Sequence, residues 1–310
     1  MSEYHLPVLL EKSVQALITD PSGIYVDATF GGGGHSRRIL ESLSPEGRLL
    51  AFDRDEDAFA NAPEDPRFTL IHNNFRFVHH YVLLDAWQQA TRDFREHSVD
   101  GILADLGVSS HQFDTAERGF SFRFDAPLDM RMDATADAKT AATVVNTYSQ
   151  QDLRRIFSLY GELQEADRIA RLLVQARENG PVTTTTGLNA AIAAVLPPFA
   201  EHKYLAKVYQ ALRIEVNAEM RSLEKFLEGA AASLRKGGRL AVITYHSLED
   251  RMVKNFIKTG NVDGVVRKDL FGKTQAPLSP VNRKPILPDE DEIAANTRAR
   301  SAKLRIAEKL

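Results

Sequence analysis

The sequence contains no cysteine. This absence excludes disulfide bonds, cysteine–zinc sites and every mechanism that needs a thiolate nucleophile. The chain also lacks long apolar runs: no stretch approaches the roughly 20 residues of a membrane span. The first residues, MSEYHLPVLLEKSVQAL, have no basic region before an apolar core and no small-residue cleavage site. We therefore expect a cytoplasmic protein.

A large excess of charge of one sign is missing as well. The 39 basic and 42 acidic residues give a formal net charge of −3. Any surface that binds nucleic acid would have to be a local basic patch. The 310 residues, 43% of them hydrophobic, are enough for one large globular domain or for a domain that carries an insertion.

Strands and helices alternate in the first third of the chain. Apolar, β-branched runs predict strands over residues 23–30, 47–55, 68–74 and 99–107. The intervening residues 34–43 and 77–90 have the pattern of helices. This alternation predicts a parallel sheet with right-handed crossovers.

The pattern changes after residue 107. Residues 108–138 have no regular period, and residues 140–212 have helical periodicity, with Leu153, Ile156, Phe157 and Tyr160 on one face. The threonines at 183–186 offer N-caps for the next helix.

The alternating pattern then resumes. It predicts a helix over 217–238 that glycine ends, a strand over 238–247, a helix over 248–258 and a last edge strand over 302–308. We predict one α/β sheet domain, formed by residues 1–110 and 213–310, and an inserted helical domain over 111–212.

The stretch DATFGGGGHS at 27–36 places four glycines between a predicted strand and a predicted helix. Such a loop lets a ligand approach the backbone closely. In an open parallel sheet, ligands bind at the carboxyl ends of the strands. Asp53 ends the second strand, where a carboxylate can accept hydrogen bonds from both ribose hydroxyls, and Asp105 ends the fourth.

Two phosphate-binding patterns do not fit this loop. No Lys-Ser or Lys-Thr follows the glycines, as a P-loop requires, and the third glycine of G-x-G-x-x-G falls on Ser36 or Arg37. The remaining pattern, Asp27-x-x-x-Gly31-x-Gly33, resembles the first motif of Rossmann-like S-adenosylmethionine methyltransferases. The alternative interpretation is a tight turn without a ligand.

Asp105 also bears on the methyl acceptor. It stands in ADLGVSS, where Leu106 and Gly107 replace the prolines that follow the acid in many amino-methyltransferases. Methylation at C5 of a pyrimidine usually needs a thiolate, so direct transfer to nitrogen or oxygen remains. Asp105 can accept a hydrogen bond from an exocyclic amine and favour its attack. Alternatively, Asp105 is only a turn or capping residue.

Aromatic and basic residues in three segments suggest contact with RNA. In ERGFSFRFDAPLDMRMD, the aromatic rings could stack on bases while the arginines hold phosphates; the alternative is a strand whose phenylalanine face joins the core. The basic residues of HKYLAKVYQALRIEVNAEM could bind phosphate or form a solvated face. In YHSLEDR, the histidine is a candidate catalytic residue that could contact substrate or relay a proton; the alternative is a structural role. The candidate residues are Arg118, Phe122, Arg123, Arg131, Lys207, Arg213 and, at the end of a strand, His246.

Taken together, these segments resemble one family, the bacterial small-subunit ribosomal RNA cytosine-N4 methyltransferases (the RsmH, formerly MraW, family). The resemblance covers nearly the whole chain and is most specific at PLDMRMD and HSLEDR. One departure is HKYLAKVYQ, where many relatives have a His-Pro-Ala-Thr-Arg stretch.

The resemblance implies a Rossmann-like class I methyltransferase domain and an inserted substrate domain. It implies S-adenosylmethionine-dependent N4-methylation of one cytidine in the decoding region of 16S rRNA, with the small ribosomal subunit as partner, no metal, and a homodimer as one option. The cofactor positions that it implies are Gly33, Gly34, His35, Asp53, Phe75, Asp105 and Gln112.

Three other hypotheses stay open on the sequence alone. The chain could methylate DNA or a small molecule, although the aromatic–arginine segment and the insertion argue against a small molecule. It could be an NAD oxidoreductase, although the third glycine is missing. It could also be a non-catalytic RNA-binding assembly protein, although the acids at both strand ends argue against a degenerate pocket.

Overall fold

The computed structural model describes residues 7–88, 99–135, 138–272 and 274–310. The chain forms two compact units. The sheet unit contains residues 1–107 and 220–310, and the helical unit contains residues 108–219. The units divide at residues 107 and 219, close to the expected boundaries at 110 and 212. The assignment of cofactor and substrate roles to two domains stays a prediction.

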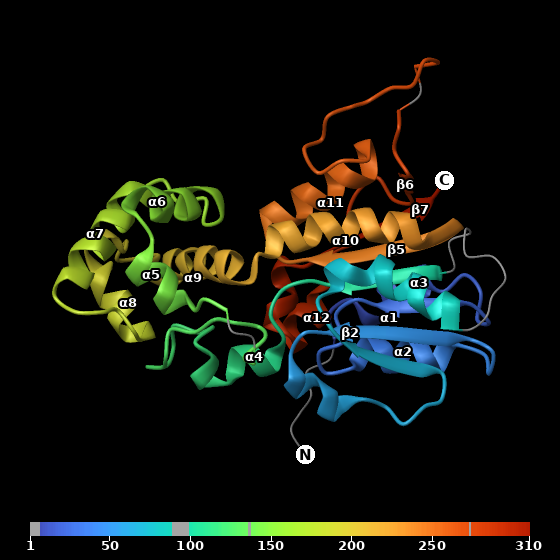
Figure 1. Cartoon of the computed structure of the whole chain (residues 1–310), viewed down its shortest axis with the longest axis horizontal. Coiled ribbons are helices and arrows are strands. Elements are labelled where there is room, and N and C mark those ends of the chain that lie inside the picture. Colours follow the sequence, from blue (N-terminus) through green and yellow to red (C-terminus); the bar gives the residue numbers. More distant parts are fainter. Residues whose placement is uncertain (1–6, 89–98, 136–137, 273) are drawn as a thin grey trace. The chain divides into compact units, whose positions relative to one another are not determined.

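The sheet unit is built on seven strands in the order β3-β2-β1-β4-β5-β7-β6 (Figure 1). The first five are parallel, β7 is antiparallel to β5, and β6 is antiparallel to β7. The strands are β1 (Ile24–Asp27), β2 (Arg48–Asp53), β3 (Phe68–His72), β4 (Val99–Asp105), β5 (Leu234–Thr244), β6 (Leu278–Pro280) and β7 (Lys303–Lys309).

Two predictions at the end of this sheet were wrong. Strand β7 is not at the edge, because the three-residue strand β6 pairs beyond it. Helix α10 (Glu219–Ser233) does not extend to the glycines at 237–238; β5 begins directly at Leu234. Leu234 is buried and pairs with Val99, so sheet pairing overrides the local helical pattern.

Helices cover both faces of the sheet (Figure 1). One core contains β-strand residues such as Val26 and residues of α10, α11 (Ser247–Thr259) and α3 (Val78–Gln88). The other contains Tyr25 and residues of α1 (Leu10–Leu17) and α2 (Gly34–Ser42). Neighbouring residues of one strand thus serve opposite layers, as the alternation of side chains requires. The predicted helix over 77–90 includes residues 89 and 90, which lie outside the described residues.

Short elements complete the sheet unit. The 3₁₀ helices η1 (Glu56–Asn61) and η2 (Phe75–Phe77) follow β2 and β3, and α12 (Glu290–Ala295) and η5 (Thr297–Ser301) precede β7. The strand order reverses direction between β1 and β4, with β2 and β3 on one side and β5 on the other. The carboxyl ends of β1 and β4 therefore form the switch point where an open parallel sheet binds its ligand.

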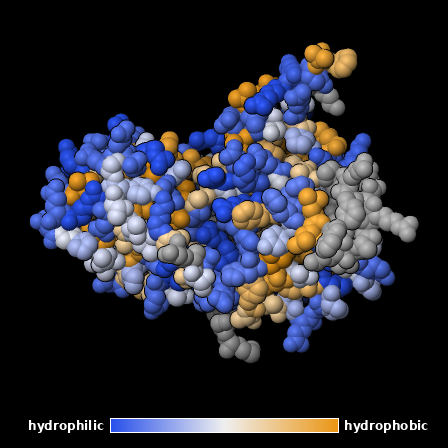
Figure 2. Space-filling model, viewed as in Figure 1, coloured by the Kyte–Doolittle hydropathy of each residue, from blue (hydrophilic) through white to orange (hydrophobic). Residues whose placement is uncertain are grey.

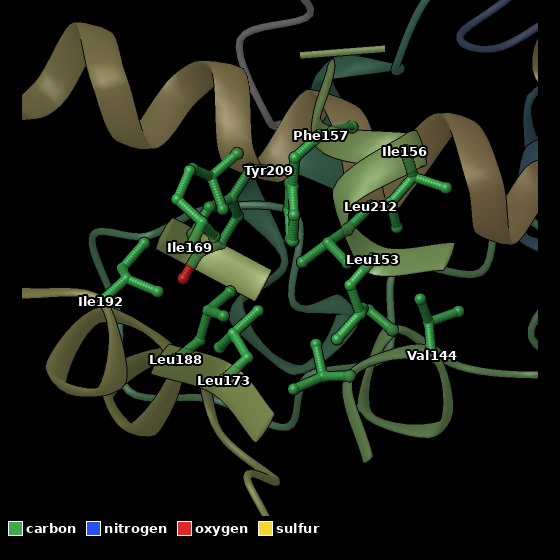
Figure 3. Packing of buried hydrophobic residues seen from close by; sticks show 14 of the residues in the cluster. Val144, Leu153, Ile156, Phe157, Ile169, Leu173, Leu188, Ile192, Tyr209 and Leu212 are labelled. Atoms are coloured by element: carbon green, nitrogen blue, oxygen red, sulfur yellow. The ribbon is translucent and has the colours of Figure 1, made fainter. Parts of the chain in front are cut away.

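The helical unit has a hydrophobic core of its own (Figure 3). Leu153, Ile156 and Phe157 are buried on one face of α6, as their spacing predicted, and Thr184 caps α8 through Gly187 N. The helices are α4 (Ser110–Asp114), α5 (Ala141–Thr147), α6 (Gln150–Leu159), α7 (Ala166–Glu178), α8 (Thr185–Ala191) and α9 (Glu201–Asn217), with 3₁₀ helices η3 (Ala116–Arg118) and η4 (Ala193–Val195).

None of the described helices has the length and apolar character needed to cross a membrane.

Candidate active site

The glycine loop connects β1 to α2 at the switch point. Gly31 and Gly33 have φ angles of 52° and 77°, a region that side-chain-bearing residues rarely adopt. A Cβ atom on Gly33 would also lie 2.8 Å from the ring of Phe30. Glycine at position 33 is therefore required by both the backbone conformation and the packing.

Asp27 joins this loop to the start of α2. Its carboxylate is fully buried and accepts hydrogen bonds from the Ser36 hydroxyl at 2.7 Å and from the Thr29 backbone N–H at 3.1 Å. Burial raises the pKa of Asp27. A dinucleotide-binding fingerprint would have its third glycine at position 36. Here Ser36 occupies that position, and its hydroxyl donates to Asp27.

Asp53, at the end of β2, reaches back to the same loop. Its Oδ2 accepts a hydrogen bond from Gly31 N at 2.7 Å, and its Oδ1 accepts one from Asp55 N at 2.9 Å. Burial raises the pKa of Asp53 to about 6, although both hydrogen bonds oppose that rise. Each carboxylate oxygen keeps lone-pair capacity. Asp53 therefore fits the hydroxyl groups of a ribose.

Asp105 lies at the end of the neighbouring strand β4. Its backbone N–H donates to Thr29 Oγ1 at 2.7 Å, which ties the strand end to the glycine loop. Its Oδ1 accepts a hydrogen bond from the hydroxyl of Tyr245 at 2.7 Å, and its Oδ2 lies 3.8 Å from Nδ1 of His35. Burial raises the pKa of Asp105 to about 6, and the hydrogen bond from Tyr245 opposes the rise.

His35 presents an unprotonated nitrogen to Asp105. Its Nε2 lies 3.2 Å from the carbonyl oxygen of Val8, which can only accept, so Nε2 carries the hydrogen. The ring is 5% exposed, and burial lowers the pKa of His35. The neutral imidazole therefore turns the lone pair of Nδ1 toward the carboxyl group of Asp105.

Tyr245 was not among the predicted site residues. It follows β5, which pairs with β4 so that Ile243 lies opposite Asp105. Burial, and then the neighbouring Asp105, raise the pKa of its hydroxyl well above the usual value, so the group stays a donor. Its position two residues past that pairing, next to His246, was the signal in the sequence that could have identified it.

His246 has the structural role that was the alternative to catalysis. It is the N-cap of α11: its Nδ1 accepts from Glu249 N at 3.4 Å, and its Nε2 lies 3.1 Å from Glu249 Oε1. Only 9% of its side chain is exposed. These contacts fix the ring at the end of β5. Any contact of His246 with substrate stays a prediction.

Phe75 begins η2, directly after β3. Its ring packs edge-to-face against Phe226 of α10, with ring centroids 5.3 Å apart. The ring is partly exposed, so an apolar edge remains for a planar ligand. Its predicted place beside an adenine ring agrees with this geometry and stays a prediction.

In the helical unit, most of the predicted contact residues have partners inside the unit. Gln112 forms the capping box of α4 with Ser109. The guanidinium of Arg118 donates to the carbonyl oxygens of Arg131 and Met132 at 3.1 and 3.0 Å. Arg131 forms a bidentate ion pair with Asp129, and Arg213 forms one with Glu219.

The aromatic segment is not a strand. Phe120 is buried in the core of the helical unit, and Phe124 is 46% exposed. Phe122 packs edge-to-face against Tyr209 and His202, with centroids 5.5 and 5.7 Å apart. The sequence allowed, as an alternative to RNA contact, a strand whose phenylalanines join the core. Phe120 and Phe122 do pack with the core, but their segment is not a strand. Arg123 is exposed.

Lys207 lines a surface pocket of about 340 Å³ in the helical unit. Lys203, Tyr204, Glu162 and Glu165 also line this pocket. The Nζ of Lys207 is 3.5 Å from the carbonyl oxygen of Glu162. Acidic and basic groups thus share this pocket, which makes it a weaker phosphate site than its lysines suggested.

The sheet order, the glycine loop and the acids at the ends of β2 and β4 define the class of Rossmann-like S-adenosylmethionine-dependent methyltransferases. A family model, the MraW methylase family, matches residues 2–310. The chain therefore belongs to the MraW methylase family, and S-adenosylmethionine is its methyl donor. Family membership contradicts the oxidoreductase alternative.

Curated relatives resemble the chain over its full length. A protein named ribosomal RNA small subunit methyltransferase H from Bacteroides fragilis (strain YCH46) is 55% identical over 306 residues, which cover 99% of this chain and 97% of the relative. One of the same name from Flavobacterium johnsoniae is 54% identical, covering 99% and 98%.

Among solved structures, an S-adenosylmethionine-dependent methyltransferase from Mesorhizobium loti covers 96% of both chains, with 10% identity and a TM-score of 0.38. This similarity is too low to support an argument about the site.

Proposed function

We propose that this methylase transfers a methyl group from S-adenosylmethionine to the exocyclic N4 amine of one cytidine in the decoding region of 16S rRNA. The observation that carries the proposal is the Asp105 cluster, a carboxyl group between a tyrosine hydroxyl and a neutral imidazole at the switch point. The names of the relatives, which are 51–55% identical to this chain, support rRNA of the small subunit as the substrate.

The proposed cofactor site uses residues of the sheet unit. Asp53 accepts hydrogen bonds from the ribose hydroxyls, the ring of Phe75 packs near the adenine, and the backbone at Gly33, Gly34 and His35 lies along the amino-acid end. Gln112 of the helical unit is proposed to contribute as well. S-adenosylmethionine supplies an electrophilic methyl group bonded to a positively charged sulfur.

The proposed chemistry is a direct displacement. The lone pair of an exocyclic amine is delocalised into the cytosine ring, so the amine is a weak nucleophile. Asp105 accepts a hydrogen bond from one N4–H and keeps the amine oriented. As the N–C bond forms and the S–C bond breaks, the N4 proton passes to the Asp105 carboxylate and S-adenosylhomocysteine leaves. A carboxyl pKa of about 6 suits a proton acceptor that works near neutral pH.

RNA contacts are proposed for the helical unit. Arg123 is exposed, and Lys207 lines the surface pocket. Phe122, Arg118, Arg131 and Arg213 make contacts within the unit, so we propose that they shape the RNA surface as much as they touch it.

The test uses small ribosomal subunits from cells that lack this protein. Purified enzyme and tritiated S-adenosylmethionine are incubated with these subunits or with DNA, and digested nucleosides are identified by mass. We expect N4-methylcytidine in 16S rRNA and no label in DNA. Label in DNA, or methylation at another atom, would overturn the proposed substrate or position.

The same assay tests the role of Asp105. Asp105→Asn keeps the shape of the side chain and removes its ability to take a proton, so we expect a loss of about 10²–10⁴-fold in the rate of transfer. The exposed Asp291→Asn is the matched control and should retain the wild-type rate. An Asp105→Asn enzyme with full activity would remove Asp105 from the mechanism.

A further inference from the structure

Residues 261–272 and 274–277 form an arm that leaves the end of α11 and returns to β6 (Figure 1). Hydrogen bonds hold it in one shape. Asn255 Nδ2 donates to Val262 O at 3.0 Å, and Val265 N donates to Asn261 Oδ1 at 3.0 Å. Farther out, Gln275 N donates to Arg267 O at 2.9 Å. The arm is thus an internally bonded hairpin.

A tight turn closes the end of the arm. Gly272 N donates to Asp269 O at 3.0 Å, and Phe271 N donates to Asp269 Oδ1 at 2.9 Å. Gly272 has a φ angle of 79°, which favours glycine at that position. This geometry leaves Leu270 and Phe271 at the tip, with exposed fractions of 101% and 95%.

The arm therefore holds large apolar side chains in water. Val265 and Val266 are also more than half exposed, and hydrophobic atoms gather at the end of the arm (Figure 2). Single exposed apolar residues are normal on protein surfaces, but a grouped set on a projecting turn suggests a binding surface. None of these four residues belongs to the described cores of the sheet unit.

The charges around the tip point to a polyanion. Over the arm, residues 261–277, the sequence has three basic residues, Arg267, Lys268 and Lys273, and two acids, Asp263 and Asp269, in a chain of net charge −3. The carboxylate of Asp269 accepts the turn hydrogen bond from Phe271 N. Arg267 and Lys268 are exposed and form no ion pair among the described residues. A flat aromatic ring beside free cations is the combination that binds unpaired nucleotides.

We propose that this arm is a second RNA-binding element, in which Phe271 stacks on an unpaired base and Arg267 and Lys268 contact the adjacent phosphates. The inference rests on the proposed function, because the ligand is a part of the rRNA substrate other than the methylated cytidine. Leu270 provides an apolar edge beside the stacked base.

The first experiment compares three variants at one position. Affinity for small ribosomal subunits lacking the modification is measured by filter binding. Phe271→Ala should weaken binding by about 5- to 150-fold, the range for loss of one base–aromatic stack. Phe271→Trp keeps a flat ring and should bind like wild type. Phe271→Leu keeps apolar surface without a ring and should bind like Phe271→Ala.

A partner protein would give a different result, because an apolar protein pocket accepts leucine. Wild-type binding by Phe271→Leu together with weak binding by Phe271→Ala would therefore overturn RNA stacking in favour of a protein contact. Wild-type affinity in Phe271→Ala would overturn the docking role altogether. All variants should bind S-adenosylhomocysteine normally, which shows that the sheet unit is folded.

The second experiment measures salt dependence with protein-free 16S rRNA. The double variant Arg267→Ala/Lys268→Ala should reduce the slope of log affinity against log salt by about 1.4, which corresponds to two contacts with single-stranded phosphates. Lys236→Ala, an exposed lysine elsewhere in the sheet unit, is the control and should leave the slope unchanged. An unchanged slope in the double variant would contradict the phosphate contacts.

The two proposals fail in different ways. If wild-type enzyme does not methylate the small subunit, the proposed function falls and the inference falls with it. If wild-type enzyme methylates the subunit while the arm variants bind it normally, only the inference is wrong.

Discussion

At the residue scale, the site depends on how three side chains share one buried position. Asp105, His35 and Tyr245 come from the end of β4, the start of α2 and the residue after β5. Tyr245 donates to the carboxylate, and the neutral imidazole of His35 presents a lone pair to it. The pKa of Asp105 is raised to about 6, so its carboxyl group can gain and lose a proton near neutral pH.

Tyr245→Phe should change the pH dependence of methyl transfer. The Tyr245 hydroxyl favours the ionised form of Asp105, so its removal raises the pKa of Asp105 further. We expect single-turnover rates to fall more at pH 6 than at pH 8.5, with the acid limb of the profile displaced to higher pH. Tyr25→Phe, which removes another hydrogen-bonded hydroxyl of the sheet unit, should leave the limb in place.

An unchanged acid limb in Tyr245→Phe, together with a uniformly lower rate, would show that Tyr245 serves only the packing of the strand end.

Asp53→Asn should change how the stability of the cofactor-free protein depends on pH. The pKa of Asp53 rises from 3.8 to about 6 on folding, so its ionisation opposes folding. This contribution is most favourable below pH 4, is lost as pH rises through 6, and stays lost above it. Relative to wild type, the variant's free energy of unfolding should increase by about 1–3 kcal/mol between pH 4 and pH 8.

Urea unfolding at the two pH values measures this difference, and the exposed Asp291→Asn is the control that should show none. An equal effect of Asp53→Asn at both pH values would contradict the assigned pKa.

The arginines show what residue types alone do not reveal. Arg118, Arg131 and Arg213 are spaced as RNA contacts in the sequence, yet their guanidinium groups bond to carbonyl and carboxylate oxygens of the same unit. A guanidinium binds a carboxylate and a phosphate with the same bidentate geometry. The sequence therefore shows that each of these positions is basic, but it does not identify the group that each guanidinium binds.

At the element scale, hydrogen bonds, backbone conformation and packing specify the glycine loop. Asp27, Gly31 and Gly33 were identified from their spacing, and the structure adds the reasons: a hydroxyl partner in Ser36, positive φ angles and the Phe30 ring.

Gly33→Ala should weaken S-adenosylhomocysteine binding more than alanine does at another glycine with a positive φ angle. Gly237 has a similar φ of 80° but open space around its missing Cβ, whereas the Cβ at position 33 would meet the Phe30 ring at 2.8 Å. Gly237→Ala should cost about 1–2 kcal/mol of stability and leave binding intact. Gly33→Ala should cost more and reduce affinity at least tenfold in calorimetry.

Equal affinity in Gly33→Ala and Gly237→Ala would mean that the loop does not form the cofactor site.

The ends of elements were harder to predict than their types. The strands over 99–107 and 238–247 were recognised from apolar runs, because buried parallel strands are continuously hydrophobic. Strand β6 was missed because a three-residue strand has no measurable period, and its Pro280 is tolerated only at a sheet edge. The helix-to-strand change at Ser233 and Leu234 has no turn residue to mark it.

At the scale of the whole molecule, two units have separate cores. Phe157 lies in the core of the helical unit and Phe226 in a core of the sheet unit, and both are fully buried. Removing a buried phenylalanine ring typically costs about 3–5 kcal/mol.

Phe157→Ala should therefore speed hydrogen exchange in α6, α7 and α9 and leave β1, β4 and β5 protected. Phe226→Ala should have the converse effect and should weaken cofactor binding, because Phe226 packs against Phe75. Faster exchange throughout the chain in either variant would show that the two cores unfold as one cooperative unit.

The sequence by itself determined the class of fold and the methyl donor, and it predicted the loop that would bind this donor. Periodicity records which residues are buried, and the spacing from Asp27 to Gly33, with Asp53 and Asp105 at strand ends, records a ligand-binding edge. Only the tertiary structure decided which side chains surround Asp105, which arginines already have partners, and that Phe271 is held in water at the end of an arm. The Tyr245–Asp105 contact joins residues 140 positions apart, which local pattern does not record. The ion pair of Arg131 with Asp129 is local, but it depends on side-chain conformations that residue types alone do not specify.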